Sequence, residues 1–253
     1  MQICGFGWQN RVLDATLTAD AQAARLPVSN LRNQQGAPSL GWRTPGTAAG
    51  LALSLSAAAP LRAISLHRTN LTALATWTVT VSSGGQPVWT TNGGPIVGGQ
   101  SVVVAPATLA GDTVRLTISD PTNPDGWLDV PLAYVGPLWQ PVRNFSTDST
   151  TGRALGQDSL TSLAGTEFVD ARWYQRTASI AHQSLGDADS AVIEQILRVA
   201  ATGQNILFLP DPGADSGTLA RQALFGRLSG ADLSNPFGAA DRHAITLTMT
   251  ERL

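Results

Sequence analysis

The stretch Ile118–Val130, ISDPTNPDGWLDV, gathers the carboxylate, amide and glycine residues from which a calcium-binding loop could be built. Such a loop needs oxygen ligands at alternate positions before a glycine and a glutamate further along. Counting back from Gly126, Asp125 and Asn123 fit, but the first ligand position falls on Pro121, and no glutamate follows at the required distance. The residues instead predict a tight hairpin, because proline fixes φ and glycine accepts a positive φ.

Other catalytic or metal-binding constellations are not assembled by the sequence. His67, His182 and His243 lie in three separate segments and share no metal-ligand spacing. No serine lies in a Gly-x-Ser-x-Gly elbow, and the phosphate-loop pattern is absent because the chain has no lysine. The only cysteine, Cys4, is expected to be a small buried residue and excludes an intrachain disulfide. We therefore expect no catalytic residue, no metal and no cofactor, and predict that the chain is not an enzyme.

Aromatic residues near arginine and aspartate offer a different chemistry, in which a ring stacks on a sugar while polar groups donate to its hydroxyls. The candidates for such a glycan contact are Trp42, Arg43, Trp89 and Trp127. A β-sandwich also buries several tryptophans in its core, and that alternative stays open for each of them.

Composition limits the classes of partner. Charged residues make up 13% of the chain and the net charge is −2, so no basic footprint for nucleic acid exists. No apolar run approaches the roughly 18 residues that a membrane-spanning helix needs. The first residues lack a basic region followed by an apolar core, so no signal peptide is expected. We expect a soluble protein that is made in a cytoplasm.

The first half of the chain has the pattern of short β-strands. Short strand-like segments are expected at Leu51–Ser56, Leu61–Asn70, Ala75–Ser83, Ser101–Ala107 and Asp112–Asp120, with glycine, proline or asparagine between several of them. Alternation places Trp77, Val79 and Val81 on one face of their segment, and Val114, Leu116 and Ile118 on one face of theirs. This spacing favours an antiparallel β-sandwich. Asp120, where one strand ends, is expected to accept backbone N–H bonds at the corner.

The second half combines strands with one strong helix. The helix is expected over Ala188–Thr202, capped by Asp187 or Asp189 and ended by Gly203. Its apolar stripe is expected to face a neighbouring subunit and consists of Val192, Ile193, Ile196, Leu197 and Val199. Glu167–Leu185 is expected to form one long strand or two with a bend, and further strands are expected in Asn205–Pro212, Thr218–Gly230 and Arg242–Leu253. The last of these alternates, with Ile245, Leu247 and Met249 on one face. This order predicts an α+β unit.

Two segments of the first half resemble galactose-binding-like domains, the discoidin-type jelly roll. In that family a Pro-x-x-Asn-Leu segment precedes a Trp-Arg pair, which here would be Pro27, Asn30, Leu31, Trp42 and Arg43. The stretch ISDPTNPDGWLDVPLAYVGPLW resembles the family's penultimate hairpin. Similar motifs are familiar in tail proteins of long-tailed, siphophage-like bacteriophages. The resemblance covers roughly residues 26–138.

The second half is similar in layout to the tail-tube fold of phage tail and baseplate subunits. In that fold two hairpins or sheets flank a single helix and the subunits form a ring. The final HAITLTMTERL resembles the closing strand of distal tail proteins. Many distal tail proteins carry the ring domain first, whereas here the sandwich comes first, which leaves the exact tail position open.

We therefore expect a mainly β protein of two domains. Residues 1–137 would form the galactose-binding-like jelly-roll sandwich, and residues 138–253 a tail-tube-like, ring-forming domain with a polar arm at about 144–167. The resemblance implies a structural virion protein, a distal or minor tail protein of the tail tip or baseplate. It would form a sixfold ring with its own copies and link the tail tube to the adsorption apparatus. Its other partners would be tail and baseplate proteins.

Two other functions remain beside that one. The alternative is a carbohydrate-binding module that recognises a host-surface glycan. A cell-wall hydrolase is less favoured, because the sequence offers no nucleophile, acid pair or metal set for it.

Overall fold

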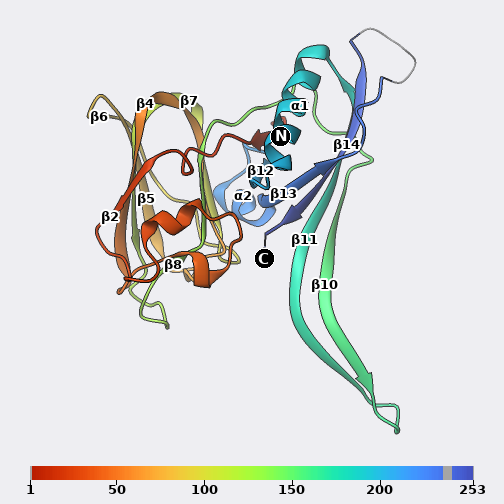
Figure 1. Cartoon of the computed structure of the whole chain (residues 1–253), viewed down its shortest axis with the longest axis horizontal. Coiled ribbons are helices and arrows are strands. Elements are labelled where there is room, and N and C mark those ends of the chain that lie inside the picture. Colours follow the sequence, from red (N-terminus) through yellow and green to blue (C-terminus); the bar gives the residue numbers. More distant parts are fainter. Residues whose placement is uncertain (1, 236–240, 253) are drawn as a thin grey trace.

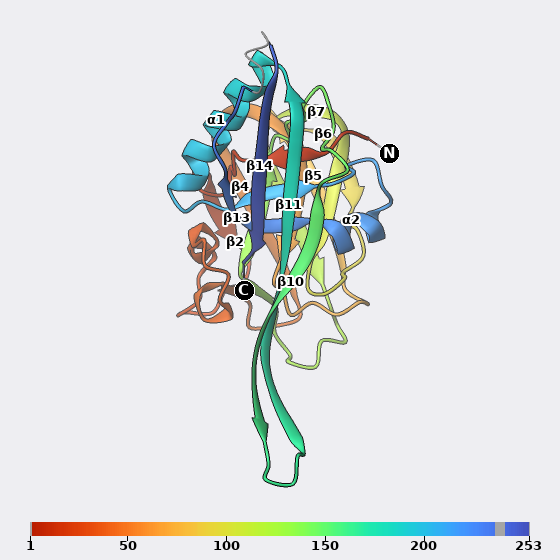
Figure 2. The same cartoon turned by 90° about the vertical axis from the view of Figure 1, so that its right-hand side faces the viewer.

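The computed structural model describes residues 2–235 and 241–252. Two β-rich units lie side by side, and a long two-stranded arm projects from the second (Figures 1 and 2). The described residues include two α-helices, α1 (Asp187–Ala201) and α2 (Ser216–Gln222), both after the sandwich. This arrangement confirms the predicted fold class, a mainly β chain in which a sandwich is joined to an α+β unit.

The first unit, the sandwich, is built on a sheet with the order β2-β4-β7-β5-β6, to which β9 adds by pairing with β4. A separate two-stranded pair joins β3 to β8. The strands are β2 (Thr16–Ala19), β3 (Trp42–Arg43), β4 (Ala48–His67), β5 (Thr76–Ser83), β6 (Gln86–Asn92), β7 (Ser101–Ser119), β8 (Asp129–Val130) and β9 (Leu132–Gly136).

Two strands of the sandwich are longer than the alternation predicted. The sequence predicted two short segments in place of β4 and two in place of β7, whereas each is one strand of about twenty residues. The register between them shifts between Ser54 and Ala59, where the side chains of Ala57 and Ala58 are exposed. One half of β4 pairs with β2 and the other with β9. Each long strand therefore bends at a corner and contributes to both layers of the sandwich.

The predicted inward faces are confirmed. Trp77, Val79 and Val81 on β5 are buried, as are Val114, Leu116 and Ile118 on β7. These side chains belong to one apolar cluster between the layers.

The segment after β7 is a loop between two sheets, so the predicted hairpin is wrong. β7 pairs with β4 and β5, whereas β8 pairs with β3. Gly126 has a φ of 75°, so the expected positive φ at this glycine is present. Buried Asp120 accepts hydrogen bonds from the Thr72 amide and hydroxyl, both at 2.8 Å, and from the Asn123 side chain at 3.1 Å. Its expected role as a backbone acceptor at this corner is confirmed, and it ties the loop to the start of β5.

The second unit is a six-stranded sheet with the order β1-β12-β13-β14-β11-β10, in which each neighbouring pair is antiparallel. Its strands are β1 (Gly5–Gly7), β10 (Thr150–Thr161), β11 (Glu167–Leu185), β12 (Ile206–Leu209), β13 (Leu224–Gly230) and β14 (His243–Glu251). The expected strand over Glu167–Leu185 is thus one long element, and the alternating C-terminal strand is confirmed.

Helix α1 differs from its prediction at the N-cap, and helix α2 was not predicted. The N-cap of α1 is Gly186, because the Asp187 carboxylate instead contacts His243 at 2.7 Å and Asp189 accepts a bond from the amide of Val142. The start of the predicted strand over Thr218–Gly230 is helix α2, since Asp215 caps it by accepting from the amide of Thr218 at 3.0 Å.

The stripe of α1 packs against its own sheet. Ile193 and Ile196 are fully buried, in one cluster with Ile180 on β11 and Met249 on β14. Val192, Leu197 and Val199 are partly buried against the same cluster. Ile193 and Ile196 are therefore not available to a neighbouring subunit, whereas an interface that includes Val192, Leu197 and Val199 stays a prediction.

The two units are joined by a buried apolar interface. Tyr134 on β9 and Phe225 on β13 belong to one buried cluster, with their ring centroids 6.1 Å apart. The chain's first strand also crosses the boundary expected at residue 137, since Phe6 pairs with Phe208 in the second sheet. A Cβ on Gly7 would lie 2.5 Å from the Tyr134 ring, so this close approach requires glycine.

Replacement of the Asp120 carboxylate tests its role in holding the loop after β7. Its replacement in Asp120→Ala leaves the Thr72 and Asn123 donors without an acceptor, so we expect the free energy of unfolding to fall by roughly 2–4 kcal/mol. Chemical denaturation measures this change. Asp14→Ala is the control, because the Asp14 side chain is exposed and forms no hydrogen bond with any described residue. Equal midpoints for the two variants would contradict the role of Asp120.

Candidate functional site

The arm, residues 154–175, is the part of the chain with the least support from its own fold. Strand β11 lies between β10 and β14 in the sheet, but β14 pairs with it only as far as Thr177. Beyond that point β11 has one partner, β10, which is the edge strand of the sheet. A two-stranded ribbon in water is marginally stable. The arm therefore offers both a free strand edge and two uncovered faces (Figure 2).

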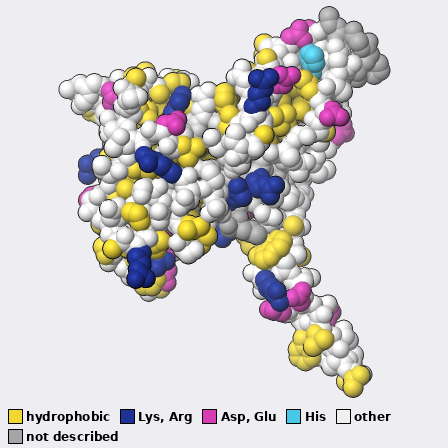
Figure 3. Space-filling model, in the orientation of Figure 1, with side chains coloured by type: hydrophobic (Ala, Val, Ile, Leu, Met, Phe, Trp, Pro, Cys, Tyr) yellow, Lys and Arg dark blue, Asp and Glu magenta, His cyan; other side chains and the backbone are white. Residues whose placement is uncertain are grey.

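The arm is rich in exposed apolar side chains. On one face Leu160 lies opposite Phe168, and they are 73% and 61% exposed. Figure 3 shows apolar groups spaced along the arm to its tip, with charged groups between them. The other large exposed hydrophobics of the arm are Leu155, Leu163, Val169, Trp173 and Tyr174. A free soluble monomer rarely exposes so much apolar surface in one place, and such patches mark contact sites.

Charged residues on the arm pair with one another across its two strands. Asp158 lies opposite Asp170, and like charges at opposed positions destabilise a strand pair. Arg172 offsets this repulsion, since its guanidinium lies 2.6 Å from Asp158 and 3.4 Å from Asp170. All three side chains are well exposed, so these pairs add little to stability.

The base of the arm is anchored by Arg176 on β11. Its guanidinium forms an ion pair with Glu251 on β14 and donates to Gln100 on the sandwich at 3.0 Å. It also donates to the carbonyls of Arg221 and Ala223, at 2.6 and 2.9 Å, where α2 ends. Arg176 thus joins the arm, both units and α2 through a single side chain.

Buried histidines lie near this anchor and near the first strand. His67 stacks on Phe225 at 4.8 Å and contacts Gln100 at 3.2 Å, and burial lowers its pKa to about 4. His182 is buried beside Phe6, neither ring nitrogen has a hydrogen-bond partner among the residues that the structure describes, and burial lowers its pKa to about 4. Both are therefore neutral at pH 7 and act as packed core residues.

A second candidate surface is the corner of the sandwich that holds Arg43 and Trp127. The Arg43 guanidinium lies 5.1 Å from the Trp127 ring centroid, and it donates two bonds of 2.7 Å to Asp129. The hydrogen bond to Asp129 raises the pKa of Arg43. Trp127 is 38% exposed, so part of its ring is open to solvent. The structure thus brings two of the four predicted glycan-contact residues together.

The other two candidates lie elsewhere. Trp42 is fully buried in the sandwich core and its indole N–H donates to the carbonyl of Ala21 at 3.0 Å, so its ring offers no surface to a sugar. Trp89 is half-buried on β6 and lines a separate cavity of about 450 Å³ with Arg62. The four residues therefore do not form one site.

Chemistry based on metals or a reactive thiol finds no support in the described part of the chain. Within residues 2–235 and 241–252, no three His, Cys, Asp or Glu side chains are placed to hold a metal ion. Cys4 is buried, as expected, and burial raises the pKa of its thiol to about 12, so it stays protonated. No helix among these residues is both long and apolar enough to cross a membrane.

Sequence reasoning missed the apolar character of the arm. Residues 144–167 were expected to be polar, and the stretch 167–175 was assigned to a body strand. The signal that could have found the arm is the run Phe168, Val169, Trp173 and Tyr174, too large and apolar for a strand with a solvated face.

Comparison with known proteins gives a likeness in fold. No protein-family model matches the sequence, and no curated protein matches it. Among solved structures, the lectin domain of lectinolysin complexed with Lewis B antigen matches with a TM-score of 0.43 and 12% identity. The match covers 51% of this chain and 96% of that one.

Two further structures give similar values. A Streptococcus pneumoniae fucose-binding module, SpX-3, has a TM-score of 0.41 at 12% identity, covering 50% of this chain and 96% of that one. The family 32 carbohydrate-binding module from C. perfringens NanJ, in complex with galactose, has 0.40 at 15%, covering 53% and 98%. These neighbours are carbohydrate-binding modules. With TM-scores below 0.5, the likeness establishes nothing about what this chain does.

The buried histidines predict a pH dependence of stability. A histidine titrates near pH 6.5 in the unfolded chain and near 4 here, so the unfolded state binds more protons between these values. Stability is fully present above about pH 6.5 and falls as the pH drops toward 4, by on the order of 3 kcal/mol per histidine. In His182→Leu, the part of the stability loss at low pH that His182 causes is expected to disappear. Urea unfolding between pH 7 and 4.5 tests this, and parallel curves for parent and variant would contradict it.

Proposed function

We propose that this chain is a structural subunit that assembles with copies of itself through its arm. The observation that carries the proposal is a two-stranded ribbon, extended beyond the body, whose large apolar side chains are exposed. A neighbouring subunit would cover these side chains and pair with the free edge of β10. The arm and its receiving surface are different surfaces, so the contact is heterologous, and such contacts close into rings when the rotation allows.

The setting we propose is the tail tip or baseplate of a bacteriophage. This part of the proposal rests on the sequence resemblance to phage tail proteins. A sixfold ring, contacts with other tail and baseplate proteins, and a place in the virion belong to the same proposal. The sandwich would then project from the ring, held by the apolar interface around Tyr134 and Phe225.

Substitution at the arm tip tests the assembly. In Leu160→Ser/Phe168→Ser, two side chains that would be buried at the contact become polar, and we expect the dissociation constant between subunits to rise by about a hundredfold. Sedimentation velocity over a range of concentrations measures it. The midpoint of thermal unfolding measured under monomeric conditions should not change, because these side chains contact nothing in the body.

The matched control is Leu74→Ser. Leu74 is 72% exposed but lies on the sandwich, away from the arm. It should leave the distribution of species as in the parent. A parent chain that stays monomeric at every concentration, or an arm variant that assembles as well as the parent, would refute the proposal.

A second candidate function is glycan binding by the sandwich. It is favoured by the half-open Trp127 ring beside the Arg43–Asp129 pair, since an aromatic face with a few fixed polar groups is a common form of ligand site. The donors of Arg43 that face Asp129 are already used, so stacking on Trp127 would carry most of the affinity.

A glycan array with the full chain tests this candidate. We expect binding that Trp127→Ala lowers by about tenfold or more, because stacking on the ring is lost. Trp89→Ala is the control, since Trp89 lines a different cavity. Absence of signal on the array, or an equal loss in both variants, would exclude a sugar site at this corner.

A further inference from the structure

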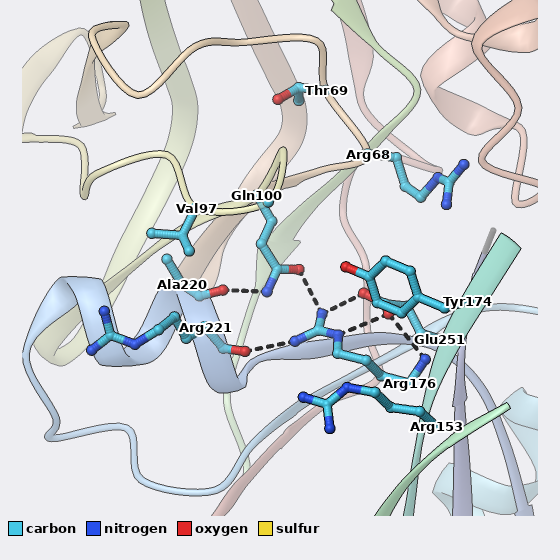
Figure 4. A pocket seen from close by; sticks show the side chains of 11 residues that line it. Arg68, Thr69, Val97, Gln100, Arg153, Tyr174, Arg176, Ala220, Arg221 and Glu251 are labelled. Atoms are coloured by element: carbon cyan, nitrogen blue, oxygen red, sulfur yellow. Dashed lines mark hydrogen bonds and ion pairs between the residues drawn. The ribbon is translucent and has the colours of Figure 1, made fainter. Parts of the chain in front are cut away.

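A cavity of about 550 Å³ lies where the sandwich meets the base of the arm, and arginines dominate its lining (Figure 4). Arg68 follows β4 of the sandwich, Arg153 lies on β10, and Arg221 lies on α2, in addition to Arg176 on β11. Glu251 is the one acidic residue of the lining. These residues come from separate stretches of the chain, so the cluster exists only in the folded protein.

The cavity has positive charge that its own residues do not neutralise. Glu251 is already paired with Arg176. Arg221 extends along α2, where it donates to the Thr218 hydroxyl at 3.0 Å, and Figure 4 shows its side chain turned away from the centre. The side chains of Arg68 and Arg153 form no hydrogen bond or ion pair with any residue in the ranges 2–235 and 241–252. Two guanidinium groups are thus free to meet a ligand.

The backbone around Arg68 is held in an unusual conformation. Its φ is 61°, in the left-handed region that non-glycine residues rarely adopt. The next residue is fixed by the bond from the Thr69 amide to the carbonyl of Gly99 at 2.8 Å, and the Thr69 hydroxyl bonds the same oxygen at 3.0 Å. Strained residues of this kind persist where the surroundings hold them, and they gather at binding sites.

Neutral groups complete the lining. The ring of Tyr174 lies between Arg68 and Arg153 in Figure 4, and it is 60% exposed. The planar guanidinium forms paired hydrogen bonds with phosphate, sulfate or carboxylate oxygens. A cavity of this volume holds a group larger than a bare ion.

We propose that this cavity binds a tetrahedral oxyanion, phosphate or sulfate, carried by a molecule of about the size of a monosaccharide. Arg68 on the sandwich side and Arg153 on the arm side lie on opposite sides of Tyr174 in Figure 4, so one guanidinium would bind the anion and the other would donate to the carrier, with Tyr174 packed against it. The Arg176–Glu251 pair would form the floor, with its own bonds intact. The cavity lies within one chain, so this site does not depend on the proposed assembly.

Calorimetric titration of the full chain tests the proposal. The probes are inorganic phosphate, inorganic sulfate and glucose 6-phosphate, at constant ionic strength so that screening stays equal. We expect saturable binding of at least one probe. Arg68→Gln and Arg153→Gln should each weaken it by about tenfold, since each removes a charge-assisted hydrogen bond.

The control is Arg198→Gln. Arg198 is exposed on α1 and pairs only with Glu194, at 3.8 Å, so its loss should leave the affinity unchanged. Circular dichroism and thermal unfolding of each variant check the fold, and unchanged curves are expected because Arg68 and Arg153 make no polar contact.

The outcomes separate the sources of the anion. Tighter binding of glucose 6-phosphate than of the inorganic ions supports a sugar-borne group, and equal affinities support the oxyanion alone. The absence of saturable heat for all three probes would overturn the proposal, as would an equal loss in Arg198→Gln. Sedimentation velocity alongside the titration keeps the two proposals apart, because a monomeric chain that binds phosphate refutes the assembly alone.

Discussion

The side chain of Arg176 is the constraint on which the arrangement of arm and body depends. A buried or half-buried guanidinium is tolerated only when its donors are satisfied. Here they are met by a carboxylate on β14, an amide oxygen on the sandwich and two carbonyls at the end of α2. These acceptors come from elements far apart in sequence. The direction of the arm is therefore fixed relative to both units by a group that could not be turned without leaving charge unpaired.

The polar anchor is set in an apolar interface. Gln100, which accepts from Arg176, also contacts His67, whose ring stacks on Phe225 in the shared cluster. Apolar burial supplies the non-directional attraction between the units, and the hydrogen-bonded chain through Gln100 selects one orientation. The result is a rigid body with a ribbon that extends beyond it. A ribbon with a fixed base can place its tip on a neighbour without a large loss of orientational freedom on binding.

Local patterns predicted the elements whose environment is simple. β14 alternates because one face packs on α1 and the core, so Ile245, Leu247 and Met249 were assigned correctly. The stripe of α1 shows that one face is covered, but it cannot say whether its own sheet or another subunit covers it. Trp42 illustrates the same limit, since a tryptophan beside an arginine has the same local pattern in a core as at a ligand site.

Other features depend on contacts that local patterns do not contain. Strands β4 and β7 bend at a corner because two layers must close around one core. The exposed residues at the corner interrupt the alternating pattern, so each long strand was predicted as two short ones. The loop after β7 has the residues of a hairpin, yet β8 pairs with β3 because Asp120 and Asn123 bind the backbone and side chains around Thr72. Helix α2 was not predicted, because the apolar residues after Asp215 also suit a strand. The arginine cavity could not be predicted at all, since its lining is assembled from distant segments.

The distribution of exposed apolar groups separates the arm from the rest of the surface. Of the thirteen large hydrophobic residues exposed among the described residues, seven lie between Leu155 and Tyr174. Single exposed hydrophobics are normal on any surface and need no partner. A concentration on about a twelfth of the chain is different, because the chain has few charged residues with which to keep such a ribbon soluble. On the sandwich the exposed groups are scattered, and only Trp127 lies beside an arginine and an acid. The exposed apolar residues are therefore concentrated on the arm, whereas those of the sandwich are spaced as on an ordinary solvated surface.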